Sequence, residues 1–464
     1  MTVGFLAWGT VILGVGAWLF ATRLRRGAML APFSIALLLL VAIFGIRPLV
    51  LAAEQNWWFN GADVGDGAVL AAGVGFWAIA ALVAGYATAR LAMARKAPND
   101  AIPTPDAVPR SLVRMSSAAL LAAACTGAWF VAMILIGGGT SFLRQLAEGR
   151  SADVSRILDG VPVLISAVPV AGVVVLAVCR LRITAFRRLS TGEELWFWAA
   201  IALATVPPLA LGNRRLLLPV ALIALVAVAR PKWDKRPPLF GLLLAGVAAL
   251  VVAAIPFVRS AGSRSTSSDL LGALALYFNT NGIGETMRSF FVSYDTEMFS
   301  YIALVGPMLG DEIPYGLGRG TLGEALLQPL PAAISPWPTW SNNILTLVFG
   351  GGCGTVACPV PSVAGVLYFD TGLIGVAVGM ALVGALMAAF EPAFLVARGW
   401  RLVALLTLAG FMPGIIRGNS VSQLWISANV LLVALILSLL LNLTRTRSRQ
   451  LLMTPTQGAT PAGA

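Results

Sequence analysis

Residues 29–53 read MLAPFSIALLLLVAIFGIRPLVLAA, with one charged residue, Arg47, which we expect to be an anchor at the membrane interface. A transmembrane helix needs about 20 predominantly apolar residues, so this stretch is long enough to cross a bilayer. Similar runs recur along the chain, at 3–22, 68–89, 116–137, 162–179, 195–212, 216–229, 239–258, 362–390, 402–416 and 422–442. The repetition predicts an all-α, polytopic membrane protein with about 11 transmembrane helices.

The composition excludes several classes of protein. Hydrophobic residues make up 58% of the chain and charged residues 11%, whereas soluble proteins have about 25% charged residues. The runs are continuous, whereas a transmembrane β-barrel shows short alternating strands. The chain contains no His, which excludes His general bases, Ser-His-Asp triads and most zinc sites. Acid–base chemistry would therefore use carboxylate, Tyr or Cys side chains.

The basic residues predict how the chain is oriented in the membrane. The run 3–22 has no basic segment before it, which favours a first span over a cleaved signal peptide. If the basic break after it is cytoplasmic, the N-terminus lies outside and the C-terminus in the cytoplasm. Every cytoplasmic break is then basic, as the positive-inside rule requires. These breaks are 23–26, 90–114, 180–188, 230–236, 398–401 and 445–449. The net charge of +12 therefore reflects topology and does not indicate nucleic acid binding.

The long polar segment 259–361 divides the chain. It contains charged residues throughout and is the only long segment that cannot cross a bilayer, whereas apolar runs flank it on both sides. We expect N-terminal transmembrane helices within 1–258, a large external loop at 259–361, further transmembrane helices within 362–442 and a cytoplasmic tail at 443–464. On this interpretation the loop covers an active site at the outer face of the membrane.

Two apolar runs are too short to cross a bilayer fully, and both border Arg residues. The run 216–229 follows Arg214 and Arg215, and the run 402–416 precedes Arg417. At about 1.5 Å per residue, roughly six missing residues leave Arg214 and Arg215 about 9 Å below the outer surface. Arg417 is recessed by the same reasoning. Recessed Arg side chains are costly unless they face a wet or anionic cavity, although snorkelling or burial against helix-end carbonyls also satisfies them.

Three carboxylates are candidates for a general base. Asp295 and Glu297 lie in the aromatic segment 289–300, where apolar surroundings raise a carboxyl pKa towards neutrality. The alternative is an ordinary interfacial helix with a solvated acidic face. Asp370 lies at the outer start of the run 362–390, where it could instead form a structural pair with an Arg.

Other side chains of the loop have both a functional and a structural interpretation. Trp337 and Trp340 suit stacking on sugar rings, but Trp residues also form the interfacial belt of membrane proteins. Cys353 and Cys358 are both external in this topology, which predicts a disulfide. Two thiols without His do not form a metal site. The chain has no phosphate-binding or dinucleotide fingerprint, so we expect no metal and no cofactor.

The region 195–440 resembles the Wzy-type O-antigen and exopolysaccharide repeat-unit polymerases. The resemblance rests on the order of the large loop and of four short motifs: Gly212-Asn213-Arg214, Pro361-Ser362, Tyr368–Gly375 and Ile416-Arg417-Gly418. Many relatives carry a Pro-Arg pair in the loop, where this chain has Pro331-Ala332. Arg319 is the residue that could supply the missing phosphate contact.

This resemblance implies a polytopic glycosyltransferase in the inner (cytoplasmic) membrane. Such an enzyme transfers the growing glycan from polyprenyl diphosphate to the next lipid-linked repeat unit at the outer face. Its donor and acceptor are lipid-linked oligosaccharides, and a flippase and a chain-length regulator are the implied protein partners. Arg214, Arg215, Arg319 and Arg417 would bind the diphosphate, Trp337 and Trp340 the sugar, and Asp295 or Glu297 would act as the base.

Two alternatives remain open. O-antigen ligases share this architecture, but their branch relies on a His in the external loop, and this chain has none. A lipid or polysaccharide transporter would show repeated halves and polar residues in the middle of the membrane. The apolar runs show no twofold pattern.

Overall fold

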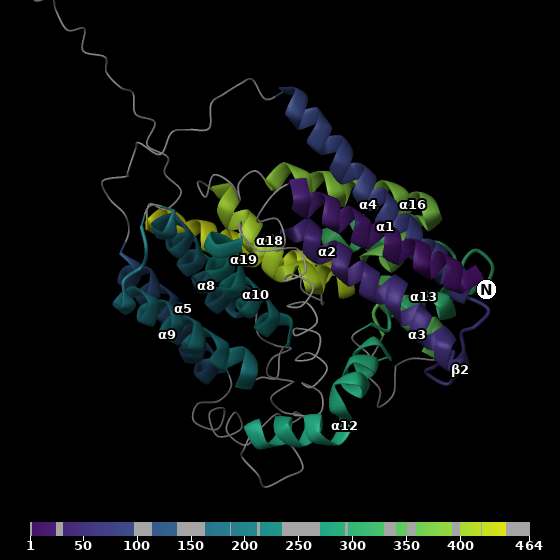
Figure 1. Cartoon of the computed structure of the whole chain (residues 1–464), viewed down its shortest axis with the longest axis horizontal. Coiled ribbons are helices and arrows are strands. Elements are labelled where there is room, and N and C mark those ends of the chain that lie inside the picture. The colour runs from purple at the N-terminus through teal and green to yellow at the C-terminus, as the bar shows by residue number, and fades with distance from the viewer. Residues whose placement is uncertain are drawn as a thin grey trace, which may run out of the picture.

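A computed structural model describes residues 2–24, 31–96, 114–136, 163–185, 187–210, 214–233, 270–292, 296–328, 340–349, 359–391, 400–418 and 420–441. Within these ranges, eight helices are long and apolar enough to cross a membrane by length and composition. They confirm a helical, polytopic membrane protein (Figure 1).

The eight helical segments lie where the sequence predicted them, within a few residues. They are α1 (Thr2–Leu24), the composite helix α2 (Pro32–Val41), η2 (Ala42–Ile46) and α3 (Arg47–Glu54), then α4 (Ala68–Lys96), α5 (Met115–Ile136), α8 (Val163–Thr184), α16 (Ser362–Phe390), α18 (Trp400–Arg417) and α19 (Ser420–Leu440). Two predicted runs coincide with further helices, α9 (Thr191–Ala210) and α10 (Arg214–Trp233). The predicted run 239–258 lies outside the described residues.

The helix α10 is longer than the apolar run that predicted it. Its apolar part is Leu216–Ala229, but the helix begins at Arg214 and ends at Trp233. The Arg pair therefore forms the first turn of the helix instead of a connecting turn. The short apolar length, on which the expected recess of Arg214 rests, is unchanged.

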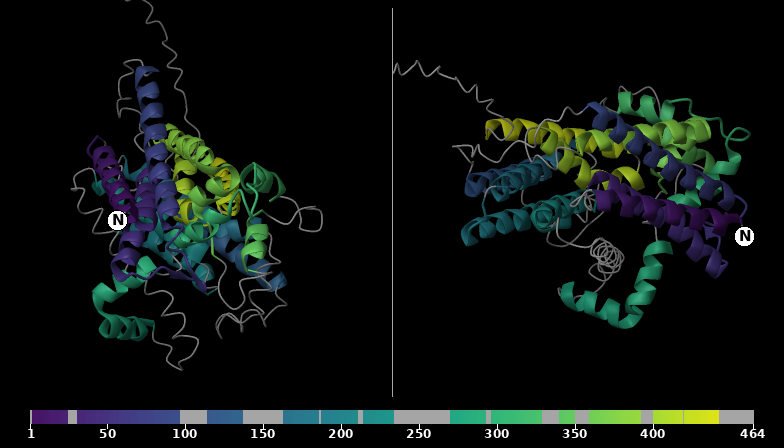
Figure 2. Two further views of the ribbon diagram at one scale, coloured as in Figure 1. Left: turned by 90° about the vertical axis from the view of Figure 1, so that its right-hand side faces the viewer. Right: turned by 45° about the horizontal axis from the view of Figure 1, so that its top comes forward.

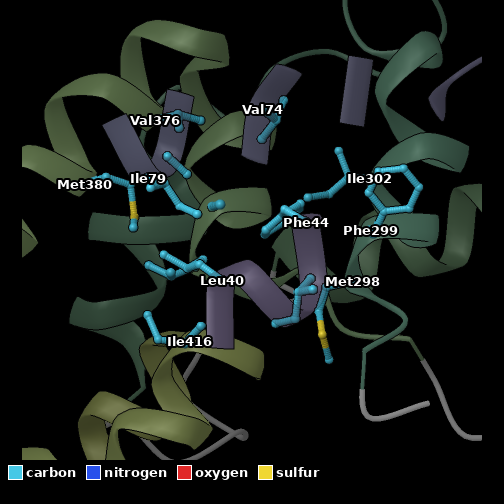
Figure 3. Packing of buried hydrophobic residues seen from close by; sticks show 14 of the residues in the cluster. Leu40, Phe44, Val74, Ile79, Met298, Phe299, Ile302, Val376, Met380 and Ile416 are labelled. Carbon is cyan, nitrogen blue, oxygen red and sulfur yellow. The ribbon is translucent and has the colours of Figure 1, made fainter. Parts of the chain in front are cut away.

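Two groups of helices form two buried clusters, which meet at α18. One cluster contains α1–α4, α16 and α13 (Met298–Val305), and the other contains α5, α8, α9, α10 and α19. Figure 1 shows the two groups on opposite sides, with α18 between them. In the first cluster Phe44 lies between Met298 and Ile302 on one side and Ile79 and Val376 on the other (Figure 3).

The helices α4 and α16 run in the same direction along their whole length. A Cβ at Gly85 would lie 2.0 Å from the Ala381 carbonyl oxygen, and one at Gly384 would lie 2.1 Å from the Leu82 carbonyl oxygen. At the far end Tyr86 hydrogen-bonds Glu391. A parallel pair of spans requires an odd number of crossings between them. The sequence predicts five in that interval.

A π-helical turn interrupts the second span at Ala42–Ile46. The sequence signal is Pro48, two residues further on, because a Pro has no N–H to donate to the Phe44 carbonyl. A local widening to i→i+5 bonding relieves the mismatch. The turn also aims Arg47 into the protein interior, where its side chain is 3% exposed.

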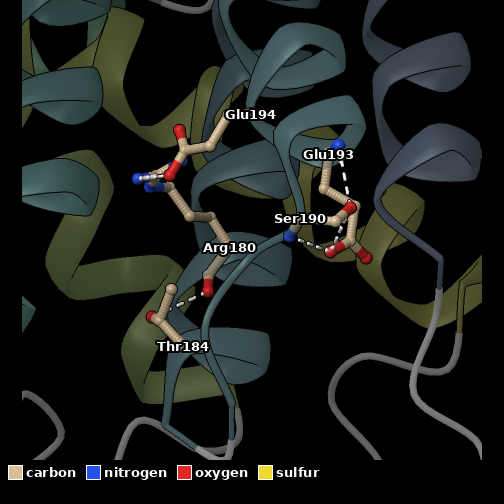
Figure 4. Close-up of polar contacts among 5 residues, drawn as sticks. All are labelled: Arg180, Thr184, Ser190, Glu193 and Glu194. Atoms are coloured by element: carbon tan, nitrogen blue, oxygen red, sulfur yellow. Dashed lines mark hydrogen bonds and ion pairs between the residues drawn. The ribbon is translucent and has the colours of Figure 1, made fainter.

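The connection between α8 and α9 is held by charged side chains (Figure 4). Arg180 forms a bidentate ion pair with Glu194, at 2.6 and 2.7 Å. Ser190 and Glu193 form a reciprocal capping box, in which each accepts a hydrogen bond from the other's backbone N–H. Hydrogen bonds from Arg187 lower the pKa of Glu193 to about 2. These contacts fix the start of α9.

The predicted external loop contains ordered helices. The first, α12 (Leu270–Val292), is interrupted at Gly282, which has φ 68°, and projects from the other described helices (Figure 2). It is followed by α13, the 3-10 turn η3 (Gly306–Met308), the π-turn η4 (Arg319–Gly323), α14 (Glu324–Leu327) and α15 (Trp340–Phe349). A short β-hairpin connects α3 to α4. Its strands are β1 (Trp58–Phe59) and β2 (Ala62–Asp63), and it turns at Asn60-Gly61, a pair typical of two-residue hairpin turns.

Candidate functional site

The helix α13 brings part of the predicted external loop into the interior of the protein. Its residues from Met298 to Ala303 are buried, and a Cβ at Gly67 would lie 1.8 Å from the Ala303 carbonyl oxygen. The backbone of α13 therefore touches the start of α4. The loop is consequently packed into the helical body at this point, and does not lie over it.

Arg47 holds the segment that leads into α13. Its guanidinium donates hydrogen bonds to the Phe291 carbonyl oxygen at 3.1 Å, to Thr296 Oγ1 at 2.9 Å and to Ser300 Oγ at 3.1 and 3.3 Å. The contacts join the second span to residues some 250 positions later in the chain. The expectation of an interface anchor at Arg47 was wrong, because the side chain points into the core and is buried there.

Glu297 belongs to the same buried cluster. The side chain is 4% exposed and interacts electrostatically with Arg47. The expected alternative of a solvated acidic face does not describe this residue. A carboxylate in this place balances the charge of the buried guanidinium. Asp295, the other predicted base, lies outside the described residues.

A second, more exposed tie joins α12 to the end of α3. Arg288 donates hydrogen bonds to both carboxylate oxygens of Glu54, at 2.5 and 3.1 Å, and to Glu285 at 2.7 Å. These partners raise the pKa of the Arg288 guanidinium, the bond to Glu54 contributing most. The second half of α12 is thus attached to the same span that carries Arg47.

Asp370 occupies a break in α16. The helix is interrupted at Thr371 and Gly372, and Gly372 has φ 67°, a conformation that favours glycine. The Asp370 carboxylate accepts hydrogen bonds from the Gly320 N–H at 2.9 Å and from Thr321 Oγ1 at 2.5 Å. Its partners are therefore a backbone N–H and a hydroxyl, and the expected pairing with an Arg was wrong.

Two backbone hydrogen bonds just before the break attach the same loop to α16, and with the contacts of the Asp370 carboxylate they form what we call the Asp370 clamp. The Gly316 N–H donates to the Phe369 carbonyl oxygen at 3.1 Å, and the Leu317 N–H donates to the Asp370 carbonyl oxygen at 2.7 Å. An interrupted helix leaves carbonyl groups without intrahelical partners. The loop 315–321 supplies those partners and is fixed on α16 as a result.

Two of the predicted phosphate-binding Arg residues lie on elements that pack around α16. Arg319 begins η4, which packs on α16 beside Asp370, and its side chain is exposed. The next helix, α14, packs on α19. Arg417 is the last residue of α18, one short turn before α19. The element that carries Arg319 and the helix that carries Arg417 thus both contact α16, and α14, which follows Arg319, contacts α19 as α18 does.

Gln423 lies in the first turn of α19, beside Arg417. The residue is 3% exposed, and Gly414 leaves space for its amide, because a Cβ there would lie 2.7 Å from Gln423 Oε1. Among the described residues, Oε1 has no hydrogen-bond partner. A buried carbonyl oxygen without a hydrogen-bond partner costs about 1–3 kcal/mol. The turn between α18 and α19 therefore offers an acceptor that a bound hydrogen-bond donor could use.

Arg214 and Arg215 form the first turn of α10, which packs on α18. A Cβ at Gly410 would lie 2.8 Å from Ile223 and 3.3 Å from the Pro219 carbonyl oxygen. Small residues allow two helices to approach closely in membranes. The helices that end at Arg417 and begin at Arg214 are therefore direct neighbours.

Of the remaining predicted residues, the structure describes only the backbone of Trp340. Trp340 begins α15. Trp337, Cys353 and Cys358 lie outside the described residues, so the sugar-stacking and disulfide predictions stay predictions. Among the described residues, no group of three or more His, Cys, Asp or Glu side chains could hold a metal ion.

Sequence reasoning missed the partners of the buried polar groups. Thr296 and Ser300 were not singled out, although the structure places both on the Arg47 guanidinium. Thr321 and Gln423 were missed for the same reason, since a lone polar residue gives no sequence signal for a partner far along the chain.

No family model matches the chain, and no curated protein and no solved structure matches it. The resemblance to repeat-unit polymerases therefore stays a prediction.

Proposed function

We propose that the protein is a glycosyltransferase that polymerises polyprenyl-diphosphate-linked oligosaccharide repeat units at the outer face of the cytoplasmic membrane. The growing glycan leaves its lipid diphosphate as the anomeric C–O bond breaks. A hydroxyl of the next lipid-linked unit forms the new C–O bond, and its proton passes to a carboxylate.

The depth at which α18 ends carries this proposal. Ile416 and Leu40 are both fully buried, α18 packs on α2, and Figure 3 draws the two side chains next to each other. Leu40 is the ninth residue of the 23-residue span Pro32–Glu54, which the predicted topology runs from the cytoplasmic to the outer side. Leu40 is therefore 14 residues, or about 21 Å, below the outer end of this span, deeper than the recess of about 9 Å expected from the sequence. Arg417 therefore follows a residue that lies well inside the helical body. A cation at such depth costs about 2.5 kcal/mol or more unless polar or anionic groups surround it, and an anionic ligand is one such group.

The contact at Gly410 supports a shared position for Arg214 and Arg417. The predicted order of crossings makes α10 and α18 antiparallel. Arg417 lies seven residues beyond Gly410, and Arg214 lies five residues before Pro219 and nine before Ile223. At 1.5 Å per residue, each Arg is then about 10 Å from the helix contact, towards the same side of the membrane. Two Arg residues at one level along the helices suit the two phosphates of a diphosphate.

The chemistry assigns the Arg residues to the leaving group. Negative charge grows on the diphosphate as the glycosidic bond breaks, so bidentate Arg contacts strengthen in the transition state. Arg319, exposed beside the α16 break, is a further contact for the same ligand. Asp295 remains the first choice for the base. Glu297 is the second, although its burial beside Arg47 suits a structural role better.

A transporter is the second candidate, and one observation favours it. The break in α16 at Thr371 and Gly372 is a discontinuous helix, a feature that transporters use to build substrate sites. In this chain, however, the loop 315–321 satisfies the backbone carbonyl oxygens of Phe369 and Asp370. A ligase that transfers to another acceptor is the third candidate.

Purified protein in vesicles with a single lipid-linked repeat unit separates these functions. We expect a ladder of lipid-linked oligosaccharides that differ by one repeat unit. Transfer only to an added second acceptor would identify a ligase. Movement of the intact lipid or glycan across the vesicle membrane, with no new glycosidic bond, would identify a transporter and refute the proposal.

A further inference from the structure

The turn formed by η4 and α14 presents leucine side chains away from the protein. Leu317, Leu322 and Leu326 are 81%, 72% and 75% exposed, although they lie in the segment predicted as an external loop. Large exposed apolar groups that gather in one place indicate an interaction surface. We call these three residues the leucine turn.

The backbone of the leucine turn is held in a strained form that maintains this exposure. Leu317 has φ 52°, which is rare for a residue with a side chain, and Gly318 follows with φ 93°. The hydrogen bonds that the Asp370 carboxylate accepts from Gly320 and Thr321 hold the turn on α16. A strained backbone conformation that the surrounding hydrogen bonds hold in place points to a functional role.

The turn lies where α16 enters the apolar layer. A Cβ at Gly306 would lie 2.6 Å from Leu70 and 3.6 Å from Tyr368, so Tyr368 is level with the first turn of α4. The clamp at Asp370 is two residues further along α16. The leucine turn is therefore attached at the ninth residue of α16, in the part of this span that is level with the first turn of α4.

The exposed face of α16 continues from this point. Ile374, Val378, Leu382 and Leu386 are all exposed and follow one another at intervals of four residues. That spacing places them on one face of the helix. In a membrane span such a face contacts lipid hydrocarbon. The leucine turn is held at Asp370, four residues before Ile374 in the sequence.

We propose that the leucine turn inserts into the outer surface of the bilayer and contacts lipid hydrocarbon directly. Continuity with the exposed face of α16 identifies the bilayer as the occupant. Arg319, exposed between Leu317 and Leu322 in the sequence, then lies at the level of the lipid phosphates. The turn acts as an interfacial anchor, of the kind formed by apolar side chains beside basic residues. The proposal does not depend on the glycosyl transfer proposed above.

Spin labels at single Cys residues test this placement in vesicles of phosphatidylethanolamine and phosphatidylglycerol. Labels are introduced by Leu322→Cys and Leu326→Cys in a full-length chain whose four native Cys residues are replaced. Glu312→Cys, at an exposed charged position in the same segment, is the aqueous control. Leu382→Cys on the exposed face of α16 is the lipid control.

Insertion predicts that labels at 322 and 326 collide readily with oxygen and several-fold less with a water-soluble nickel chelate than the label at 312. Collision with the chelate equal to that at 312 would show a turn in water and overturn the proposal. Protection from both oxygen and the chelate would show that protein covers the turn, which also overturns it.

A second measurement keeps all native Cys residues. Leu322→Trp adds one emitter to the chain, and brominated phospholipids quench Trp that touches their acyl chains. The variant should show additional quenching relative to the unmodified protein, whereas Glu312→Trp should not. Equal quenching of the two variants would contradict insertion, and the thermal unfolding of each variant shows that it is folded.

Discussion

Arg47 is the residue that ties the predicted external loop to the membrane-spanning helices. Arg47 lies in the second span and donates hydrogen bonds to Phe291, Thr296 and Ser300, and Glu297 balances its charge. Removing one partner of a buried pair leaves the other charge uncompensated, which costs roughly 3–5 kcal/mol. Arg47→Ala should therefore lower the free energy of unfolding by about that amount.

Thermal unfolding in detergent measures this effect. Arg288→Ala is the matched control, because Arg288 also joins α12 to the second span, through Glu54, but is half exposed. We expect a large fall in the melting temperature for Arg47→Ala and little change for Arg288→Ala. Equal changes in the two variants would mean that Arg47 has no special role in holding α13.

The sequence identified single residues better than their partners. The unusual positions of Asp370 and Arg47 could be seen from the apolar runs around them. Their partners could not, since Thr321 lies 49 residues from Asp370 and Ser300 lies 253 residues from Arg47. The suggested pairing of Asp370 with an Arg was wrong, because Gly320 and Thr321 of a neighbouring loop donate the hydrogen bonds that its carboxylate accepts.

At the level of elements, α4 and α16 depend on glycines for their close packing. A Cβ at Gly384 would lie 2.1 Å from the Leu82 carbonyl oxygen. A side chain at this position would therefore force the two helices apart. Gly384→Ala should lower the free energy of unfolding by about 1–3 kcal/mol, the usual cost of overpacking. Gly73→Ala in α4 is the control, since nothing lies within 4 Å of its Cβ position.

The control should be neutral or slightly stabilising, because Ala favours helix over Gly by up to about 1 kcal/mol. Thermal unfolding of the two variants in the same detergent compares them. A Gly384→Ala variant as stable as Gly73→Ala would contradict the close approach of the two helices.

The start of α9 should respond to pH through Glu193. The folded state lowers the pKa of Glu193 from 4.5 to about 2, so its ionised form stabilises folding. This contribution is fully present above the unfolded pKa and is lost as pH falls through the folded pKa. The difference in melting temperature between the unmodified protein and Glu193→Gln should be constant above pH 5 and shrink between 4.5 and about 2. A difference that does not change with pH would contradict the Arg187–Glu193 interaction.

Most elements could be predicted because a membrane span needs a long apolar run. The sequence indicates where the irregular elements lie, but not which kind of irregularity each one is. Pro48 and Gly372 mark the π-helical turn η2 and the break in α16, but neither shows which irregularity occurs. The buried helix α13 was not predicted, because an apolar stretch of eight residues is too short to distinguish from a loop.

For the whole molecule, the parallel arrangement of α4 and α16 constrains the topology. An odd number of crossings must separate them, so the start of α16 lies on the same side of the membrane as the start of α4. That this side is the outer one stays a prediction. A membrane-impermeant thiol reagent should therefore react in intact cells with a Cys placed by Ser341→Cys. It should not react with one placed by Thr104→Cys. The reverse pattern would overturn the predicted orientation.

The central claim is that Arg417, deep in the helical body, binds the diphosphate leaving group. Arg401, exposed at the opposite end of α18, is the matched control. Polymer synthesis by the purified protein is compared for Arg417→Lys, Arg401→Lys and the double variant Arg214→Ala, Arg417→Ala, after thermal unfolding has shown that each is folded. We predict that Arg417→Lys shortens or abolishes the oligosaccharide ladder, because an ammonium group cannot reproduce the bidentate contact. Arg401→Lys should leave the ladder unchanged. A ladder of normal length from the double variant would contradict the account.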